Sequence, residues 1–147
     1  MSLAQAAAGG EATTTLADAL NGHGWFLARA GHFPQAIEFC QQSLAMHRLL
    51  GDTHGEPSAL DSLAFAYSGL GRHAEAADCY RRAVRLTAEL GSEYLTGTTL
   101  IHAGDAYHDG GDIPAARDAW TQALKILEKL QHRDMSKVQA RLSMISQ

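Results

Sequence analysis

A repeat of 40 residues constrains the fold of this chain more than any other feature. Gly31, Gly71 and Gly111 lie 40 positions apart, and the segments around them align without a gap as GHFPQAIEFC, GRHAEAADCY and GDIPAARDAW. A fixed period of this length, written in helical pattern, indicates helix pairs that stack side by side, because each pair buries its apolar face against the next. We therefore expect function to reside in a surface rather than in a catalytic centre.

The same residue types recur at matched positions of each unit. Within the second unit, spacings of four and three place Leu60, Ala64 and Tyr67 on one face of its first helix. Small residues recur where the two helices of a pair must approach closely. These small positions are Gly24, Ala64 and Gly104 in the first helix and Ala36, Ala76 and Ala116 in the second. We interpret all of them as core positions, not as site residues.

Turn and capping residues agree with the period. The dipeptides Gly51-Asp52 and Gly91-Ser92 predict a helix stop followed by a capping residue for the next helix. Pro34 and Pro114 fall just inside the second helix of their units, where a missing N–H costs no intrahelical hydrogen bond.

These residues resemble a known family. The tetratricopeptide repeat pattern, W-x2-L-G-x2-Y followed by A-x3-F and A, is matched in spacing by Leu60, Leu63, Ala64, Tyr67, Ala76, Tyr80 and Ala83. The resemblance covers about residues 16–130 and implies an all-α superhelix of three helix pairs that binds proteins. Because the period exceeds the family's usual length, each helix should be longer by roughly three residues.

A narrower resemblance concerns the parent protein. The segment LGDTHGEPSALDSLAFAYSGLGRHAEAADCYRRAVRL is similar to arrays near the C-terminus of actinobacterial regulators of the antibiotic regulatory protein (SARP) and NB-ARC type. In those regulators the array follows a DNA-binding and a nucleotide-binding module. The resemblance implies a fragment of a transcriptional or signalling regulator, whose array receives a partner or holds the nucleotide-binding module inactive.

The domain organisation follows from the pattern. Residues 1–11 have no apolar period and are predicted to be a flexible lead-in, and residues 12–147 form one domain. Its repeats span about 13–52, 53–92 and 93–132. The tail, about 134–146, is predicted to be an amphipathic helix that caps the third repeat or, alternatively, forms a dimer contact. Its apolar positions are Met135, Val138, Leu142 and Ile145, after an N-cap at Asp134.

Composition excludes several classes of function. Twelve Lys and Arg against 16 Asp and Glu give a net charge of −4, which argues against direct nucleic-acid binding. The basic cluster Arg81, Arg82 and Arg85 is interpreted as a solvated helix face. No apolar stretch is long enough to cross a membrane, and no secretory signal pattern is present, so we expect a cytoplasmic location. Cys40 and Cys79 belong to no C-x-x-C pair and are expected to be reduced thiols.

Catalytic motifs are absent from the sequence: it has no phosphate-binding loop, no G-x-S-x-G elbow and no H-E-x-x-H helix. The best candidate for a metal site is His102, Asp105 and Asp109, spaced three and four apart on one helix face. That face offers at most three ligands of mixed hardness, and no further Cys or His obviously completes the set. We predict a polar groove wall, no metal, no cofactor and no enzymatic activity.

The remaining candidate is the concave surface lined by the first helix of each pair. It combines apolar Trp25, Phe65 and Ile101 with several carboxylates, which suits an extended or helical peptide carrying apolar and basic side chains. The predicted partner-binding residues are Asp18, Asn21, Trp25, Arg29, Asp61, Phe65, Ser68, Ile101, Asp105, His108 and Asp109.

Three alternatives bear on this surface. Trp25 and Phe65 could instead be wedged between neighbouring repeats. Chaperone-binding arrays of the family hold a C-terminal carboxylate with Lys, Asn and Arg, but here only Asn21 matches, so that activity is not expected. The partner is predicted to be a protein, a peptide or another domain of the parent protein. The alternative function is homo-oligomerisation, such as a homodimer, through the array edges or the C-terminal helix.

Overall fold

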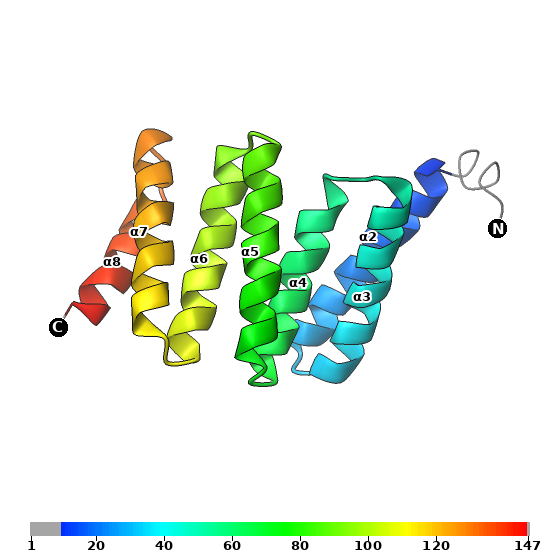
Figure 1. Cartoon of the computed structure of the whole chain (residues 1–147), viewed down its shortest axis with the longest axis horizontal. Helices are drawn as coiled ribbons and strands as arrows, with labels where there is room; N and C mark the ends of the chain where they lie inside the picture. Colours follow the sequence, from blue (N-terminus) through cyan, green and yellow to red (C-terminus); the bar gives the residue numbers. More distant parts are fainter. Residues whose placement is uncertain (1–9, 147) are drawn as a thin grey trace.

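The computed structural model describes residues 10–146, and within them it contains seven α-helices and no strand. They follow one another as a row of upright rods (Figure 1). The helices are α2 (Gly10–Arg29), α3 (Phe33–Leu50), α4 (Gly55–Gly69), α5 (His73–Glu89), α6 (Glu93–Asp109), α7 (Ile113–Lys129) and α8 (Met135–Ile145). Helix α2 begins inside the segment predicted to be a lead-in, whose residues 1–9 lie outside the described part.

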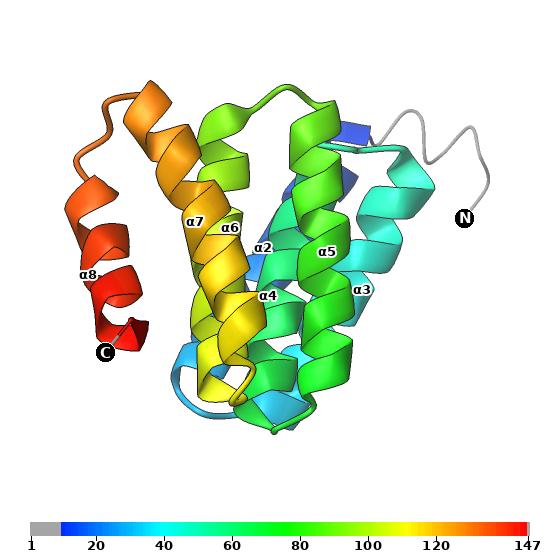
Figure 2. The same cartoon turned by 60° about the vertical axis from the view of Figure 1, so that its left-hand side comes forward.

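Consecutive helices pack in pairs: α2 with α3, α4 with α5, and α6 with α7. Each second helix also packs against the first helix of the next pair, while α2 contacts α4 and α4 contacts α6. The first helices therefore form one continuous layer, and the turned view shows α5 and α7 in front of it (Figure 2). This arrangement confirms the predicted all-α superhelix of three helix pairs with a C-terminal capping helix.

The turns explain why the glycines recur. Gly31, Gly71 and Gly111 end the first helix of their pairs at φ values of 78–86°, a left-handed conformation that costs little only for glycine. Gly51 and Gly91 do the same after the second helices. The turn before α8 departs from this rule, because Gln131 takes a positive φ of 52° without being glycine.

The predicted helix caps form in part. The Ser92 hydroxyl accepts a hydrogen bond from the Leu95 N–H at 3.3 Å and so caps α6. Asp52 accepts from the backbone N–H groups of His54 and Gly55 just before α4. Asp134 stands at the N-cap of α8, as predicted, but its side chain makes no capping hydrogen bond.

Small residues permit the close helix packing inside each pair. A Cβ atom added at Gly24 would overlap Sγ of Cys40, and one added at Gly104 would overlap the indole of Trp120. Alanine is fully buried at the recurring positions Ala36, Ala64 and Ala116. The distance between the two helices of a pair is thus set by small residues at positions where a larger side chain has no room.

The last helix completes the core at the third repeat. Val138 of α8 is fully buried with Trp120 and Leu127 of α7, and three further apolar residues of α8 pack around them. Those partly buried residues are Met135, Leu142 and Ile145. The apolar face of the tail is therefore used inside the molecule. None of the described helices has the length and apolar character needed to span a membrane.

Candidate functional site

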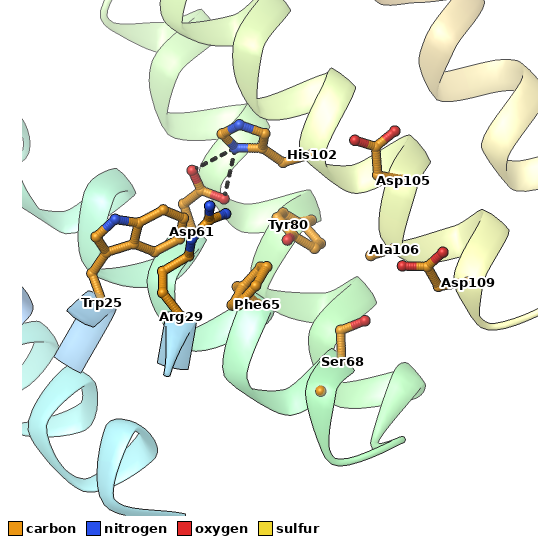
Figure 3. A pocket seen from close by; sticks show the side chains of 11 residues that line it. Trp25, Arg29, Asp61, Phe65, Ser68, Tyr80, His102, Asp105, Ala106 and Asp109 are labelled. Atoms are coloured by element: carbon orange, nitrogen blue, oxygen red, sulfur yellow. Dashed lines mark hydrogen bonds and ion pairs between the residues drawn. The ribbon is translucent and has the colours of Figure 1, made fainter. Parts of the chain in front are cut away.

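A cavity of about 260 Å³ opens on the layer of first helices (Figure 3). We call it the groove cavity. Three first helices contribute its walls, and Tyr80 of α5, only 2% exposed, lies at its floor. Its lining residues are Trp25 and Arg29 of α2, Asp61, Phe65, Ser68 and Gly69 of α4, Tyr80 of α5, and His102, Asp105, Ala106 and Asp109 of α6.

The α2 side of the groove cavity is aromatic. Trp25 and Phe65 contact each other with ring centroids 5.3 Å apart, and the Arg29 guanidinium lies 5.4 Å and 5.9 Å from the two centroids. Phe65 packs against the core, yet both rings line the cavity, and Trp25 is 38% exposed. The rings therefore join neighbouring repeats, as one of the two alternatives from the sequence expected, and they also line the cavity.

An ion pair between α4 and α6 lies at one edge of the groove cavity (Figure 3). Nδ1 of His102 lies 2.9 Å from Oδ2 and 3.2 Å from Oδ1 of Asp61. The hydrogen bond that His102 donates to the Asp61 carboxylate raises the pKa of His102, against the opposing effect of burial, and the negative charges of Asp61 and Asp105 add to the rise. The raised pKa favours the cationic form of the His102 ring beside the Asp61 carboxylate.

Asp105 points to the capping helix. It accepts a hydrogen bond from the Trp120 indole N–H at 3.1 Å and two from Arg141 of α8, from Nε at 2.7 Å and from Nη2 at 3.1 Å. Such a bidentate pair with arginine is among the stronger polar contacts in proteins. Asp105 therefore lines the groove cavity, but its charge is already matched from inside the molecule.

The candidate metal face does not converge. His102 is hydrogen-bonded to Asp61, and Asp105 is hydrogen-bonded to Arg141, so these two side chains do not converge with Asp109 on one point. Across the residues that the structure describes, no three His, Cys, Asp or Glu side chains are grouped to hold a metal ion.

Seven of the eleven predicted partner-binding residues line the groove cavity: Trp25, Arg29, Asp61, Phe65, Ser68, Asp105 and Asp109. Four do not. Asp18 lies with Oδ1 3.4 Å from Nε2 of the buried His47, and the Asn21 side-chain oxygen is buried without a hydrogen bond. Ile101 packs against the core, and His108 stacks on Trp120 with centroids 5.6 Å apart.

Two polar residues that line the groove cavity are not among the predicted partner-binding residues. Tyr80 was assigned to the core, where it is, but its ring also forms the cavity floor. His102 was considered as a metal ligand and as part of a polar groove wall, but not as a partner-binding residue, although it lies one period plus one residue after Asp61, a spacing that is visible in the repeat.

The outer helices offer less. Arg81 pairs with Asp78, and Arg82 lies 3.5 Å from Glu56, so two members of the basic cluster are engaged with carboxylates. Both cysteines are free thiols. Burial raises the pKa of Cys40 to about 12 and that of Cys79 to about 11, the latter with help from the Asp78 charge.

Comparison with known proteins addresses the family. A family model described as a tetratricopeptide repeat matches residues 15–89 and 57–129. Among solved structures, the apo form of RapI is similar with a TM-score of 0.79 at 14% identity, over 90% of this chain and 37% of that one. A putative kinesin light chain of Podospora anserina with nearly identical TPR-like repeats gives a TM-score of 0.76 at 19% identity, over 90% and 65%. At these identities the likeness shows the fold alone. No curated protein matches the sequence. The chain spans about a third and about two thirds of its two structural neighbours, respectively.

Proposed function

Because the chain belongs to the tetratricopeptide repeat family, we propose that it is a non-catalytic module that binds a protein or peptide segment in the groove cavity. Repeats of this family generally mediate contacts between proteins. The observation that carries the proposal is the groove cavity itself, to which all three first helices contribute around the half-exposed Trp25. Aromatic anchors in such a setting commonly dominate the energy of binding a partner.

The size and chemistry of the cavity support a peptide ligand. A volume of about 260 Å³ lies at or below the lower limit for small-molecule sites, and it suits one or two inserted side chains. Phe65, Tyr80 and Ala106 supply apolar surface, and the charged residues stand around it. These features favour a segment with an apolar side chain flanked by charged groups.

The setting of the module is part of the proposal. The resemblance to actinobacterial regulators of SARP and NB-ARC type supports a role in transcriptional regulation or signalling in the cytoplasm. The structural neighbours are longer than this chain, which is compatible with a partner that is another domain of the same protein.

A comparative pull-down tests the proposed function. The wild-type module and a Trp25→Ala, Asp61→Lys variant would serve as baits in a lysate of the source organism, after both are matched for helicity by circular dichroism. Arg85→Ala, on the exposed side of α5, is the matched control. A partner retained by wild type and control but lost by the groove variant supports the proposal. Partners that all three baits retain contradict it.

A second candidate is self-association through the first helix pair. Leu16 and Phe26 of α2 are 53% and 68% exposed, and Leu49 of α3 is 74% exposed, so the first helix pair presents three large apolar side chains to solvent. The C-terminal helix is the weaker alternative, because its apolar face already packs on α7. Light scattering over a concentration series would show a dimer that Phe26→Asp abolishes. A monomer at every concentration excludes this candidate.

A further inference from the structure

We propose that the groove cavity selects a dipolar peptide segment, with an acidic group placed against Arg29, a basic group placed against Asp109, and an apolar side chain between them. This inference rests on the proposed function and specifies its ligand. The number of carboxylates along the groove alone would favour a basic ligand. We infer a dipolar ligand instead, because most of the charged groups that line the cavity are already paired with one another or with Arg141.

Arg29 is the cation left free for a ligand. Within the described residues its contacts are the ring faces of Trp25 and Phe65, and no carboxylate lies within 4.0 Å of it. A guanidinium carries five N–H donors in a planar fork that matches a carboxylate. The two rings hold this fork beside the cavity through cation–π contacts. A ligand carboxylate could therefore bind Arg29 without displacing another anion.

The two inner carboxylates are not free in the same way. Asp61 faces His102 across 2.9 Å, and Asp105 receives two hydrogen bonds from Arg141. A ligand cation that used either of them would have to separate an existing pair. A ligand cation placed against Asp61 would also lie on the same side of the groove cavity as the cationic Arg29, and the two positive charges would repel each other.

Asp109 is the carboxylate that remains. Its side chain is 77% exposed, and within the described part of the chain the one basic side chain within 4.0 Å of it is the imidazole of His108, whose Nδ1 is 3.9 Å away. Asp109 lies near the end of α6, on the opposite side of the groove cavity from Arg29 (Figure 3). A ligand base can pair with it while the ligand acid pairs with Arg29.

The space between the two charged ends is mainly apolar, with Ser68 at its edge (Figure 3). Phe65, Tyr80 and Ala106 line it, and helix α4 separates α2 from α6. A ligand with two basic groups would meet Arg29, and a ligand with two acidic groups would meet Asp109, so each is disfavoured by one like-charge contact. The arrangement therefore encodes both the kind and the order of the ligand's charges.

Selection from a displayed library of random dodecapeptides tests this inference. The baits are wild type, Arg29→Glu, Asp109→Lys, Trp25→Ala and the outer-face control Arg85→Glu, each first shown to be helical. We expect wild type and the control to enrich peptides with one acid and one base flanking an apolar residue. Arg29→Glu should enrich peptides with two bases, and Asp109→Lys peptides with two acids. A wild-type peptide should bind each groove variant about fivefold more weakly or worse.

The outcomes separate the inference from the proposed function. One outcome overturns the dipolar selection while groove binding stands. In it, Trp25→Ala no longer enriches the wild-type peptides, but wild type, Arg29→Glu and Asp109→Lys all enrich peptides with the same charges. A wild-type bait that enriches nothing beyond Trp25→Ala would overturn both. If Arg29→Glu fails to fold, Arg29→Gln serves in its place and should lose the preference for an acid.

Discussion

His102 and Asp61 join the third repeat to the second across the groove, with Nδ1 of the imidazole 2.9 Å from Oδ2 of the carboxylate. The pair comes from helices α6 and α4, whose direct contact is otherwise slight compared with that inside a helix pair. It therefore links two first helices at the wall of the groove cavity.

This pair makes part of the stability dependent on pH. Because the hydrogen bond to Asp61 raises the folded-state pKa of His102 above its ordinary value of about 6.5, the stabilisation is fully present below that value. It is lost as the pH rises through the folded-state pKa. We expect His102→Gln to lower the unfolding midpoint more at pH 6 than at pH 9. The corresponding difference in the free energy of unfolding should be below about 1 kcal/mol, because the pair is partly exposed.

Thermal unfolding followed by circular dichroism measures that difference. Comparing variants at each pH cancels the other histidines, which titrate in both proteins. In an Asp61→Asn background the pH dependence of the same His102→Gln change should become smaller, because the main cause of the raised pKa is gone. If His102→Gln destabilised the protein equally at pH 6 and pH 9 in the wild-type background, the assignment of this pH dependence to the pair would be contradicted.

The packing of the third helix pair predicts a strong dependence on Gly104. Since a Cβ atom there would overlap the indole of Trp120, which is 1% exposed, Gly104→Ala should destabilise the fold by about 1–3 kcal/mol. Gly22 is the matched control: a Cβ atom at this position in α2 meets nothing within 4 Å. Gly22→Ala should be neutral or stabilising by up to about 1 kcal/mol.

Chemical denaturation of both variants gives the two free energies of unfolding. Equal effects of the two substitutions would mean that helix propensity, and not the approach of Trp120, governs these glycines.

The bidentate pair between Arg141 and Asp105 predicts where α8 is anchored. Arg141→Ala should cost about 1 kcal/mol or more, because it also leaves the carboxylate without its cation. The amides of Met135–Ile145 should then exchange with solvent faster, while those of α4 and α5 change little. Lys137→Ala, which removes an exposed pair with Asp134, should leave hydrogen exchange nearly unaltered. Faster exchange spread evenly over all helices would argue against a local anchor.

The two thiols should be unreactive in the folded protein. Burial raises the pKa of Cys40 to about 12 and that of Cys79 to about 11, so little thiolate exists at pH 8, and the nucleophile is the thiolate. With a disulfide reagent such as Ellman's reagent, the unfolded chain should react completely and the folded chain slowly, Cys79 before the fully buried Cys40. Cys79→Ser should remove the faster of the two folded-state phases. Rapid folded-state reaction of Cys40 would show that the first helix pair opens.

The sequence predicted the fold well because the information is periodic and local. Leu60, Ala64 and Tyr67 define one helix face by spacing alone, and the turn glycines take the left-handed conformation that their position requires. Capping was less predictable. At Asp134 the residue type is right, yet its side chain makes no capping bond, and His132 instead accepts from the Asp134 backbone N–H.

The site was predictable only in outline. The stripe of first-helix positions contains most of the cavity lining, because it depends on the repeat register alone. The state of each charge depends on contacts between helices that the spacing does not reveal. Asp105 was counted as an open acid, but Arg141 reaches it from a helix outside the repeat pattern, 36 positions away. Asp18 belongs to the stripe and yet faces His47.

The measurement that tests the central claim most directly is a titration of the ¹⁵N-labelled module with its best library-selected peptide, followed by amide and indole chemical shifts. The account predicts that the largest changes fall on the cavity positions of α2, α4 and α6, around Trp25, Phe65 and Asp109. It also predicts that Trp25→Ala removes them without changing the spectrum of the remaining fold. Shifts concentrated on α3, α5 and α7, with Trp25 unaffected, would contradict a binding site in the groove cavity.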